Sequence, residues 1–343
     1  MLNPAVKLQN RVIKTTITLN DGELTETKEF ISKGGRFTTG IISQQPRVYM
    51  RQDFSVTLLP NVAGGGLGRA EISLYNLSDD TSREIEAKGL NVKLEAGWEG
   101  KTGELFSGKI SSVIRTKRES GSTDVITTLY CCMGLSILQA KMFQGNFNQL
   151  TNIRSIIELI AKNVGLTAQI DDEVQGSTEG TFEGNVVTIL SKLSTLSTLK
   201  VGFNFYFTND FLVVKARVPI SQVKVIQYYS PTSGLLDIPV VTEKGVDIKV
   251  FLDPQIRSGD GFELSSKFAN FNLGNLNYSN RVRGQFLNTF NAPLNNNRYQ
   301  GVYQALSISH DGSSHENIWE TNISAMGAVQ FQAINETLRL DNL

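Results

Sequence analysis

The chain has 343 residues, 40% hydrophobic and 19% charged, a globular balance that allows two or three domains with substantial cores. Its 33 Lys and Arg residues equal its 33 Asp and Glu residues, so the formal net charge is zero, which excludes the basic excess of duplex-binding proteins. No apolar run approaches membrane-spanning length and the first residues lack the apolar core of a signal peptide, so we expect folding in a cytoplasm without membrane insertion.

The first region, residues 1–138, is predicted to consist mainly of strands. Alternation of apolar and polar residues predicts six of them, over residues 12–19, 48–59, 70–77, 91–98, 104–117 and 124–132. Antiparallel strands with short links are typical of a small barrel or sandwich. One short helix is expected over residues 81–87, with the polar residues 78–80 before it and Gly89 at its end.

Two adjacent cysteines, Cys131 and Cys132, lie in the last of these strands. Neighbouring side chains of a strand point to opposite faces, so we expect one thiol inside and one outside. A disulfide between them would be strained, and a reducing cytosol would disfavour it.

The pattern changes in residues 139–221, which are predicted to form a small α/β module. Apolar residues at helical spacing predict helices over 149–164 and 186–196, with Gly165 ending the first and Asn185 capping the second. Strands over 203–208 and 211–216 follow, joined by a hairpin turn at Asn209-Asp210.

Strands return in the third region, residues 222–343. They are predicted over 223–229, 246–252, 262–267, 299–310 and 318–325, and residues 328–343 are expected to form a terminal helix or arm. An insertion over residues 268–298 holds ten Asn and is predicted to be a long functional loop or an element that orders on assembly.

No pattern in the chain predicts a catalytic, cofactor or metal site. Gly100-Lys101-Thr102 lacks the glycine that a phosphate loop requires five residues before Gly100, and it joins two strands. His310 and His315 bracket Asp311-Gly312, a hairpin signal, and no Cys or third His lies near them in sequence to complete a metal site.

Two tryptophans are predicted to belong to the core. Trp98 and Trp319 each fall on the apolar phase of their strand, where packing is the default role and an interface the minority one.

Residues 70–110 run in the order strand, short helix, strand and hairpin, returning through Leu105-Phe106-Ser107-Gly108. This order resembles the first barrel of phage baseplate hub proteins, a group that includes the central hub of contractile phages and the late-control-D-type tail proteins. The stretches 239–248, 252–254 and 261–266 resemble the extended hairpins of that family. Residues 304–312, closing on 319–321, resemble its terminal hairpin, so the resemblance spans roughly residues 10–326.

The resemblance implies a mainly β fold in which two tube-like antiparallel β-barrels, in residues 1–138 and 222–343, flank the α/β module of 139–221. It implies a homotrimeric structural protein whose six barrels form a ring between the six-fold tail tube and the central spike. The expected partners are therefore the tail tube protein, the spike and other baseplate proteins, with DNA passing through the lumen without specific binding. Such a protein would be a virion component assembled in the bacterial cytoplasm, not an enzyme.

Two alternatives stay open from the sequence. A distal tail or tube-initiator protein would need only one barrel, whereas a tail-associated cell-wall hydrolase would need two carboxylates across a cleft or an activated nucleophile. The α/β module could also bind glycan.

The Asn-rich insertion carries spaced aromatic residues of the kind that dominate protein interfaces. We expect it to dock onto a neighbouring subunit or the spike, through a candidate interface formed by Phe268, Phe271, Tyr278, Phe286 and Phe290.

Overall fold

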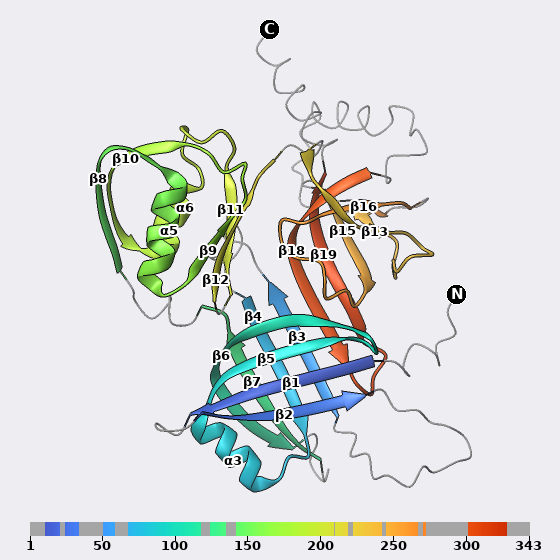
Figure 1. Ribbon diagram of the computed structural model, residues 1–343. Helices are drawn as coiled ribbons and strands as arrows, with labels where there is room; N and C mark the ends of the chain where they lie inside the picture. Colours follow the sequence, from blue (N-terminus) through green and yellow to red (C-terminus); the bar gives the residue numbers. More distant parts are fainter. Residues whose placement is uncertain are drawn as a thin grey trace, which may run out of the picture. The chain divides into compact units, whose positions relative to one another are not determined.

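The computed structural model of the chain describes residues 11–20, 25–33, 51–58, 68–117, 124–134, 142–208, 210–218, 222–241, 245–266, 270–271 and 301–327 (Figure 1). The fold is mainly β, and the described part contains three α-helices. The chain divides into two compact units. The first comprises residues 1–217, 252–255 and 309–320, and the second comprises 218–251, 256–308 and 321–343.

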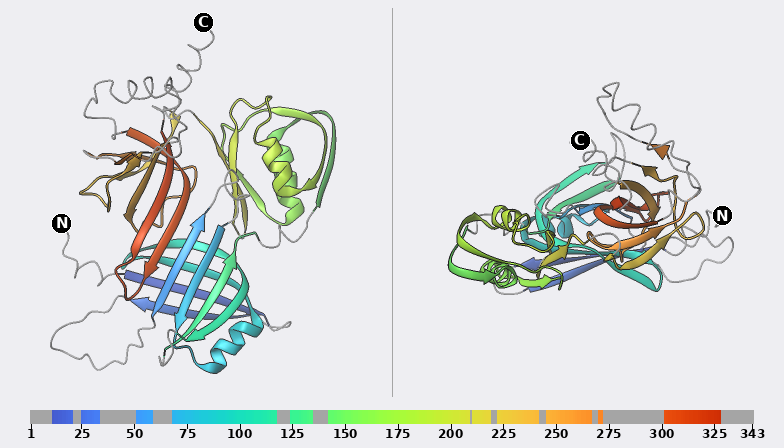
Figure 2. Two further views of the ribbon diagram at one scale, coloured as in Figure 1. Left: turned by 180° about the vertical axis from the view of Figure 1, so that it is seen from behind. Right: turned by 90° about the horizontal axis from the view of Figure 1, so that it is seen from above.

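The first unit contains an antiparallel sheet of seven consecutive strands (Figure 2, left). Its spatial order is β3-β4-β7-β6-β5-β1-β2, with antiparallel pairing at every step. The C-terminal end of β18 (Gly301–Ser313), whose residues 309–313 belong to this unit, lies next to β3. The strands are β1 (Arg11–Asn20), β2 (Thr25–Lys33), β3 (Gln52–Leu58), β4 (Gly68–Tyr75), β5 (Gly89–Trp98), β6 (Lys101–Lys117) and β7 (Val125–Cys132).

The predicted alternation is what builds the core of this sheet. In β1 every second side chain is buried, among them Ile13 and Ile17, because residues two apart share a face. The core continues through buried Phe54, Ile72, Leu74, Val92, Leu94, Phe106 and Leu129. Each such side chain stabilises the fold by about 1.5–3 kcal/mol on full burial.

One strand of this sheet, β2, was not predicted from the sequence. Its segment TETKEFISK alternates poorly because it is an edge strand that pairs only with β1 among the described residues. Cys131 is buried and Cys132 half-buried, and both are free, as predicted for adjacent residues of a strand. Burial raises the pKa of the Cys131 thiol to about 12.

The predicted helix between β4 and β5 is confirmed as α3 (Asp79–Lys88), two residues longer at its start and one at its end. The Ser78 hydroxyl caps it by accepting a hydrogen bond from the Thr81 amide at 3.2 Å. Asp79 and Asp80 lie in the first turn, where the helix dipole favours negative charge. Gly89 ends the helix in an extended conformation.

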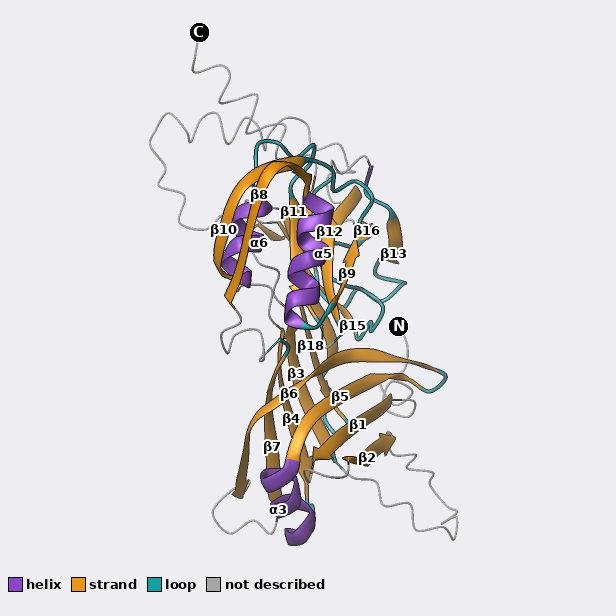
Figure 3. Cartoon of the chain, turned by 60° about the vertical axis from the view of Figure 1, so that its left-hand side comes forward, coloured by secondary structure: helices purple, strands orange, loops and turns teal. Residues whose placement is uncertain are grey.

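Residues 142–216 of the first unit form the α/β module (Figure 3). A two-stranded antiparallel ribbon of β8 (Met142–Asn152) and β10 (Ser177–Asn185) faces helices α5 (Ile153–Val164) and α6 (Val186–Leu193). A second sheet runs β11 (Phe203–Phe207), β12 (Phe211–Ala216) and β9 (Thr167–Ile170), with β9 parallel to β12.

Caps set the helix ends in this module and correct two predicted boundaries. Residues 149–152 belong to β8, and α5 begins after them because the Asn152 side chain accepts the Arg154 amide hydrogen bond at 2.9 Å. Asn185 caps α6 in the same way, as predicted. Helix α6 ends at Leu193 instead of 196, since the Ser194 hydroxyl bonds back to the Ser191 carbonyl at 2.7 Å. Gly165 ends α5 with a left-handed φ of 81°.

The second unit contains the strands β13 (Val225–Tyr229), β14 (Val240–Val241), β15 (Gly245–Phe251), β16 (Gly261–Leu264), β17 (Asn270–Phe271), β18 and β19 (Trp319–Gly327). They lie in the order β17-β14-β15-β19-β18-β16-β13. Phe262 lies at the centre of the core, fully buried, with Tyr229 at 5.5 Å and Tyr303 at 5.8 Å between ring centroids. No pairing among the described residues closes the sheet of either unit into a barrel.

Candidate functional site

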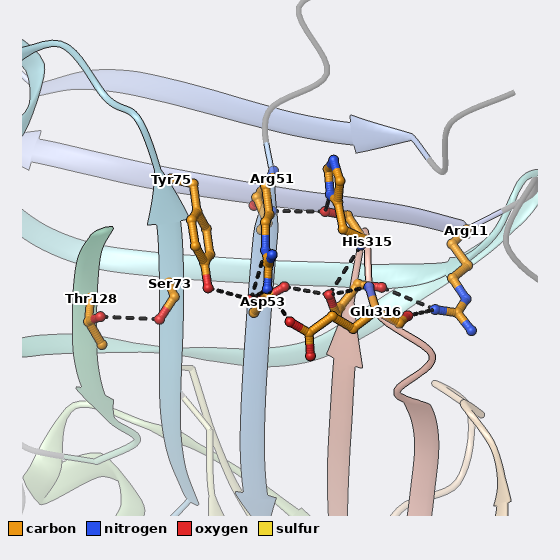
Figure 4. Close-up of polar contacts among 11 residues, drawn as sticks. Arg11, Arg51, Asp53, Ser73, Tyr75, Thr128, His315 and Glu316 are labelled. Atoms are coloured by element: carbon orange, nitrogen blue, oxygen red, sulfur yellow. Dashed lines mark hydrogen bonds and ion pairs between the residues drawn. The ribbon is translucent and has the colours of Figure 1, made fainter. Parts of the chain in front are cut away.

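A polar cluster lies in the first unit, around the loop that joins β18 to β19 (Figure 4). We call residues 309–320 the tip segment. Strand β18 continues to Ser313 and β19 begins at Trp319, so the turn spans 314–318. The predicted hairpin between the two strands is therefore present, but its turn lies after Asp311-Gly312 and not at these two residues.

Packing explains why a glycine occupies position 312 although the chain does not turn there. A Cβ at Gly312 would lie 2.4 Å from the ring of Phe54 and 3.0 Å from that of Trp319. The glycine lets the strand approach these two rings, so the sequence signal indicated a close contact and not a hairpin turn.

Trp319 fixes the tip segment in the core of the first unit. Its side chain is 2% exposed and lies edge-on to Phe54 and Trp98, at centroid distances of 5.9 and 6.1 Å. The predicted core role of both tryptophans is confirmed, since Trp98 packs against the same hydrophobic cluster.

Arg11, at the start of β1, binds the backbone of the turn. Its Nη1 atom donates to the carbonyl oxygens of Glu316 at 2.6 Å, Ser313 at 3.2 Å and Ile318 at 3.4 Å. Its guanidinium carbon lies 5.0 Å from the ring of Trp319, within cation–π range. The residue is 3% exposed, and burial lowers its pKa to about 10, which keeps it protonated at neutral pH.

Asp53, on β3, organises the side chains beneath the turn. Its Oδ1 accepts a hydrogen bond from the Ser313 hydroxyl at 2.6 Å, and its Oδ2 accepts one from the Tyr75 hydroxyl at 2.7 Å. The Ser313 oxygen in turn accepts the amide hydrogens of His315 and Glu316, at 3.1 and 2.8 Å. One carboxylate thus holds the hydroxyl that closes the turn.

Arg51 joins the two carboxylates of the cluster. Its Nη2 atom lies 2.9 Å from Asp53 and 2.5 Å from Glu316, and its guanidinium lies 4.4 Å above the Tyr75 ring. Burial lowers the pKa of Arg51, but the hydrogen bonds that Arg51 donates to the Asp53 and Glu316 carboxylates outweigh it, so the net pKa is raised.

Ser314 and His315 are the only neighbouring hydroxyl–imidazole pair of the cluster, so their geometry tests for nucleophilic chemistry. The Ser314 oxygen lies 2.8 Å from His315 Nδ1, but it also accepts a hydrogen bond from the backbone amide of Gln52 at 3.0 Å. Asp53, which would have to orient the imidazole, bonds Arg51, Tyr75 and Ser313 instead. The arrangement therefore positions a turn rather than a reacting group.

The pKa of His315 is lowered, chiefly by burial and next by the charge of Arg51, with Asp53 acting in the opposite direction. The other histidine, His310, is fully buried in β18. The described residues contain no group of three or more His, Cys, Asp or Glu side chains that could hold a metal ion.

Most of the predicted interface residues lie outside the described residues. This holds for Phe268, Tyr278, Phe286 and Phe290, and of Phe271 only the backbone, in β17, is described. The roles of Arg11, Arg51 and Asp53 were not predicted from the sequence. A signal existed for Arg11, because it occupies the buried phase of an alternating strand, where a cation requires a partner.

Within the described residues, no helix has the length and apolar character needed to cross a membrane.

No curated protein matches the sequence. Among solved structures, a tail protein from Neisseria meningitidis MC58 is similar, with a TM-score of 0.50, 9% identity, and coverage of 92% of this chain and 96% of that one. The 43 kDa tail protein of prophage MuSo2 from Shewanella oneidensis also has a TM-score of 0.50, with 8% identity over 93% of this chain and 97% of its own. A family model described as baseplate hub gp41 matches residues 70–279.

Proposed function

The chain belongs to the baseplate hub gp41 family, and from that premise we propose that it is a structural hub subunit at the end of a phage tail. The observation that carries the proposal is the family match over residues 70–279, which spans both units. The polar cluster fits this role, because its hydrogen bonds hold the tip segment in place.

We further propose that the hub is a homotrimer whose six similar β regions match a six-fold tail tube. The strand order supports this. The order β3-β4-β7-β6-β5-β1 of the first unit corresponds, strand for strand along the chain, to β14-β15-β19-β18-β16-β13 of the second. The correspondence is not complete, since β1 and β5 are antiparallel whereas β13 and β16 are parallel, and neither β2 nor β17 has a counterpart.

Internal duplication has a physical purpose in such a ring. Three chains that each carry two similar regions offer six nearly equivalent faces to the tube while keeping a three-fold axis for the spike. We retain the division into tube-like barrels at 1–138 and 222–343 around the module at 139–221, and we expect 1–138 and 222–326 to superpose. Tail tube protein, spike and other baseplate proteins are the partners, in a virion whose parts assemble in the bacterial cytoplasm.

The charge balance supports passage of DNA through the ring. A wall rich in Lys and Arg would attract phosphates and slow the passage, whereas this chain has a formal net charge of zero. We therefore expect a neutral or acidic lumen, and a ring structure whose lumen is lined mainly by basic side chains would contradict this.

The proposed subunit contact involves the aromatic residues of 268–298. Replacing Phe286 and Phe290 with Ala should weaken assembly and leave the subunit folded, because aromatic side chains supply much of the binding energy of interfaces. Limited proteolysis checks the proposal: equal protection of 268–298 in the free and assembled protein would mean that the segment does not dock.

The trimer is tested by native mass spectrometry of the purified full chain. The expected result is a species of three times the 37.8 kDa of one chain. Rings built from six chains would instead mean that each chain contributes one β region. A peptidoglycan zymogram tests the alternative of a cell-wall hydrolase, and clearing by the pure chain would overturn the purely structural role.

A further inference from the structure

The ribbon of the α/β module has an unpaired edge. Strands β8 and β10 pair with each other and with no third strand among the described residues, and helices α5 and α6 lie on one side of them (Figure 3). The outer edge of β8 spans eleven residues, so it presents a long row of backbone amide and carbonyl groups to a further strand.

This edge lacks the charged side chains and the proline that often prevent strand addition, although β8 has a bulge over residues 148–150, where its register against β10 shifts. The β8 segment MFQGNFNQLTN contains no Lys, Arg, Asp, Glu or Pro. By contrast, the edge strand β2 carries Lys28 and Lys33. The edge of β10 is less suited to pairing, because Gly180 and Gly184 depart from strand conformation with φ of 121° and 134°.

The exposed face of β8 is complementary to itself. Its even-numbered residues, from Met142 to Asn152, are all exposed, and they include Met142 at 63% and Leu150 at 72%. An antiparallel copy centred on Asn146 would place Met142 opposite Leu150 and Gln144 opposite Asn148. Both apolar side chains would then gain a cross-strand partner, and the amides between them could hydrogen-bond.

The register of β8 against β10 does not disturb this pattern. It shifts by two residues between Phe147 and Thr151, since Phe147 pairs with Gly180 and Thr151 with Thr178. A shift of two keeps the even-numbered side chains on one face, because the side-chain period of a strand is two.

We propose that a second copy of this chain docks on the β8 edge, giving a four-stranded sheet in the order β10-β8-β8-β10 about a two-fold axis at Asn146. The neutral outer face brings no like charges together, which favours a second copy over a charged partner strand. Pairing along a single strand buries less surface than the total of about 1,600 Å² that a standard protein interface buries. We therefore expect a weak dimer.

The place of this dimer rests on the proposed function. A two-fold contact cannot repeat around a ring of three chains, so the β8 contact belongs to the free subunit and not to the ring. In the free subunit this contact covers the edge of β8, which would otherwise be open to non-specific strand pairing.

Sedimentation equilibrium of the full chain, up to about 10⁻⁴ M, tests the proposal with two matched variants. Leu150→Lys puts a charge at the β8 edge, and Leu159→Lys makes the same change on α5, where the leucine is 46% exposed. At rising concentration the monomer of wild type and of Leu159→Lys should give a species of twice its mass, separate from the trimer expected for the ring, and this pairing should be at least tenfold weaker in Leu150→Lys. Equal association of all three proteins, or a wild type that stays monomeric, overturns the proposal. Trimers are recognised separately, as species whose mass is three times that of one chain or a multiple of it. Leu150→Lys should leave the amount of these species unchanged.

Cysteine cross-linking tests the register. In Asn146→Cys the two new thiols face each other at about 4.5–5.5 Å between Cα atoms, within disulfide range, and lose two protons and two electrons to dissolved oxygen. In Gln144→Cys the two thiols lie about 13 Å or more apart along the strands. A covalent dimer should form in the first variant and at least tenfold less in the second and in wild type, whose Cys131 and Cys132 are buried and half-buried. Equal cross-linking of both variants would exclude the register.

Discussion

Replacing Arg11 by Met removes the guanidinium that joins β1 to the turn of the tip segment. The Met side chain keeps much of the apolar stem, so the change acts mainly on three carbonyl hydrogen bonds and on the contact with Trp319. The bond to Ser313 is buried, whereas those to Glu316 and Ile318 are partly open to water.

The expected loss of stability follows from these contacts. A buried hydrogen bond from a charged donor stabilises a fold by about 1.5–3 kcal/mol, and a cation–π contact adds about 1 kcal/mol. In the variant, water can donate hydrogen bonds to the carbonyls of Glu316 and Ile318 in place of Arg11. The variant also avoids the cost of burying a charged guanidinium, the same burial that lowers the pKa of Arg11, and this offsets part of the loss. We therefore expect the free energy of unfolding of the first unit to fall by about 2 kcal/mol.

Tryptophan fluorescence during urea unfolding measures this change. The chain has two tryptophans, Trp98 and Trp319, and both lie in the affected core, so the signal reports the first unit. Lys14→Met is the matched control on β1, because it removes a partly exposed ion pair with Glu29 and should cost less than about 0.5 kcal/mol. Equal midpoints for Arg11→Met and Lys14→Met would refute the role assigned to Arg11.

Two further changes probe the same cluster. The folded-state pKa of His315 lies below its ordinary value of about 6.5, so its contribution to stability is present above that pH and lost as the pH falls. Stability of the wild type should therefore decline more steeply below about pH 6.5 than that of His315→Gln, and parallel curves would contradict the burial of the imidazole. Gly312→Ala forces a methyl group against Phe54 and should cost about 1–3 kcal/mol in urea unfolding, as for an overpacked core. Gly301→Ala, where the nearest atom is 4.0 Å away, is its control, and equal losses would mean that packing is not the cause.

The regular parts of the fold could be predicted because local chemistry determines them. The alternation of β1, the Ser78 and Asn185 caps and the left-handed Gly165 each act within a few residues, and the structure has them where the sequence indicated. Strands β8 and β10 were not predicted, since amides, glycines and threonines alternate without an apolar signal.

The polar cluster could not be predicted from local patterns. Arg11 and Ser313 are 302 positions apart, and no local sequence pattern around either residue indicates that the two are in contact. Asp53 sits among residues that predict a strand and Ser313 among residues that predict a turn, and neither pattern indicates the hydrogen bond between their side chains. Gly312 misled the prediction because a glycine after Asp favours a turn as strongly as it permits a close approach.

Cryo-EM of the assembled tail end, with the copies of this chain counted in the ring, tests the central claim most directly. The account predicts three copies between tube and spike, with residues 1–138 and 222–326 of each chain contributing alternate, superposable β regions around the lumen. A ring of six copies, or three copies in which only one of the two regions lines the lumen, would contradict it.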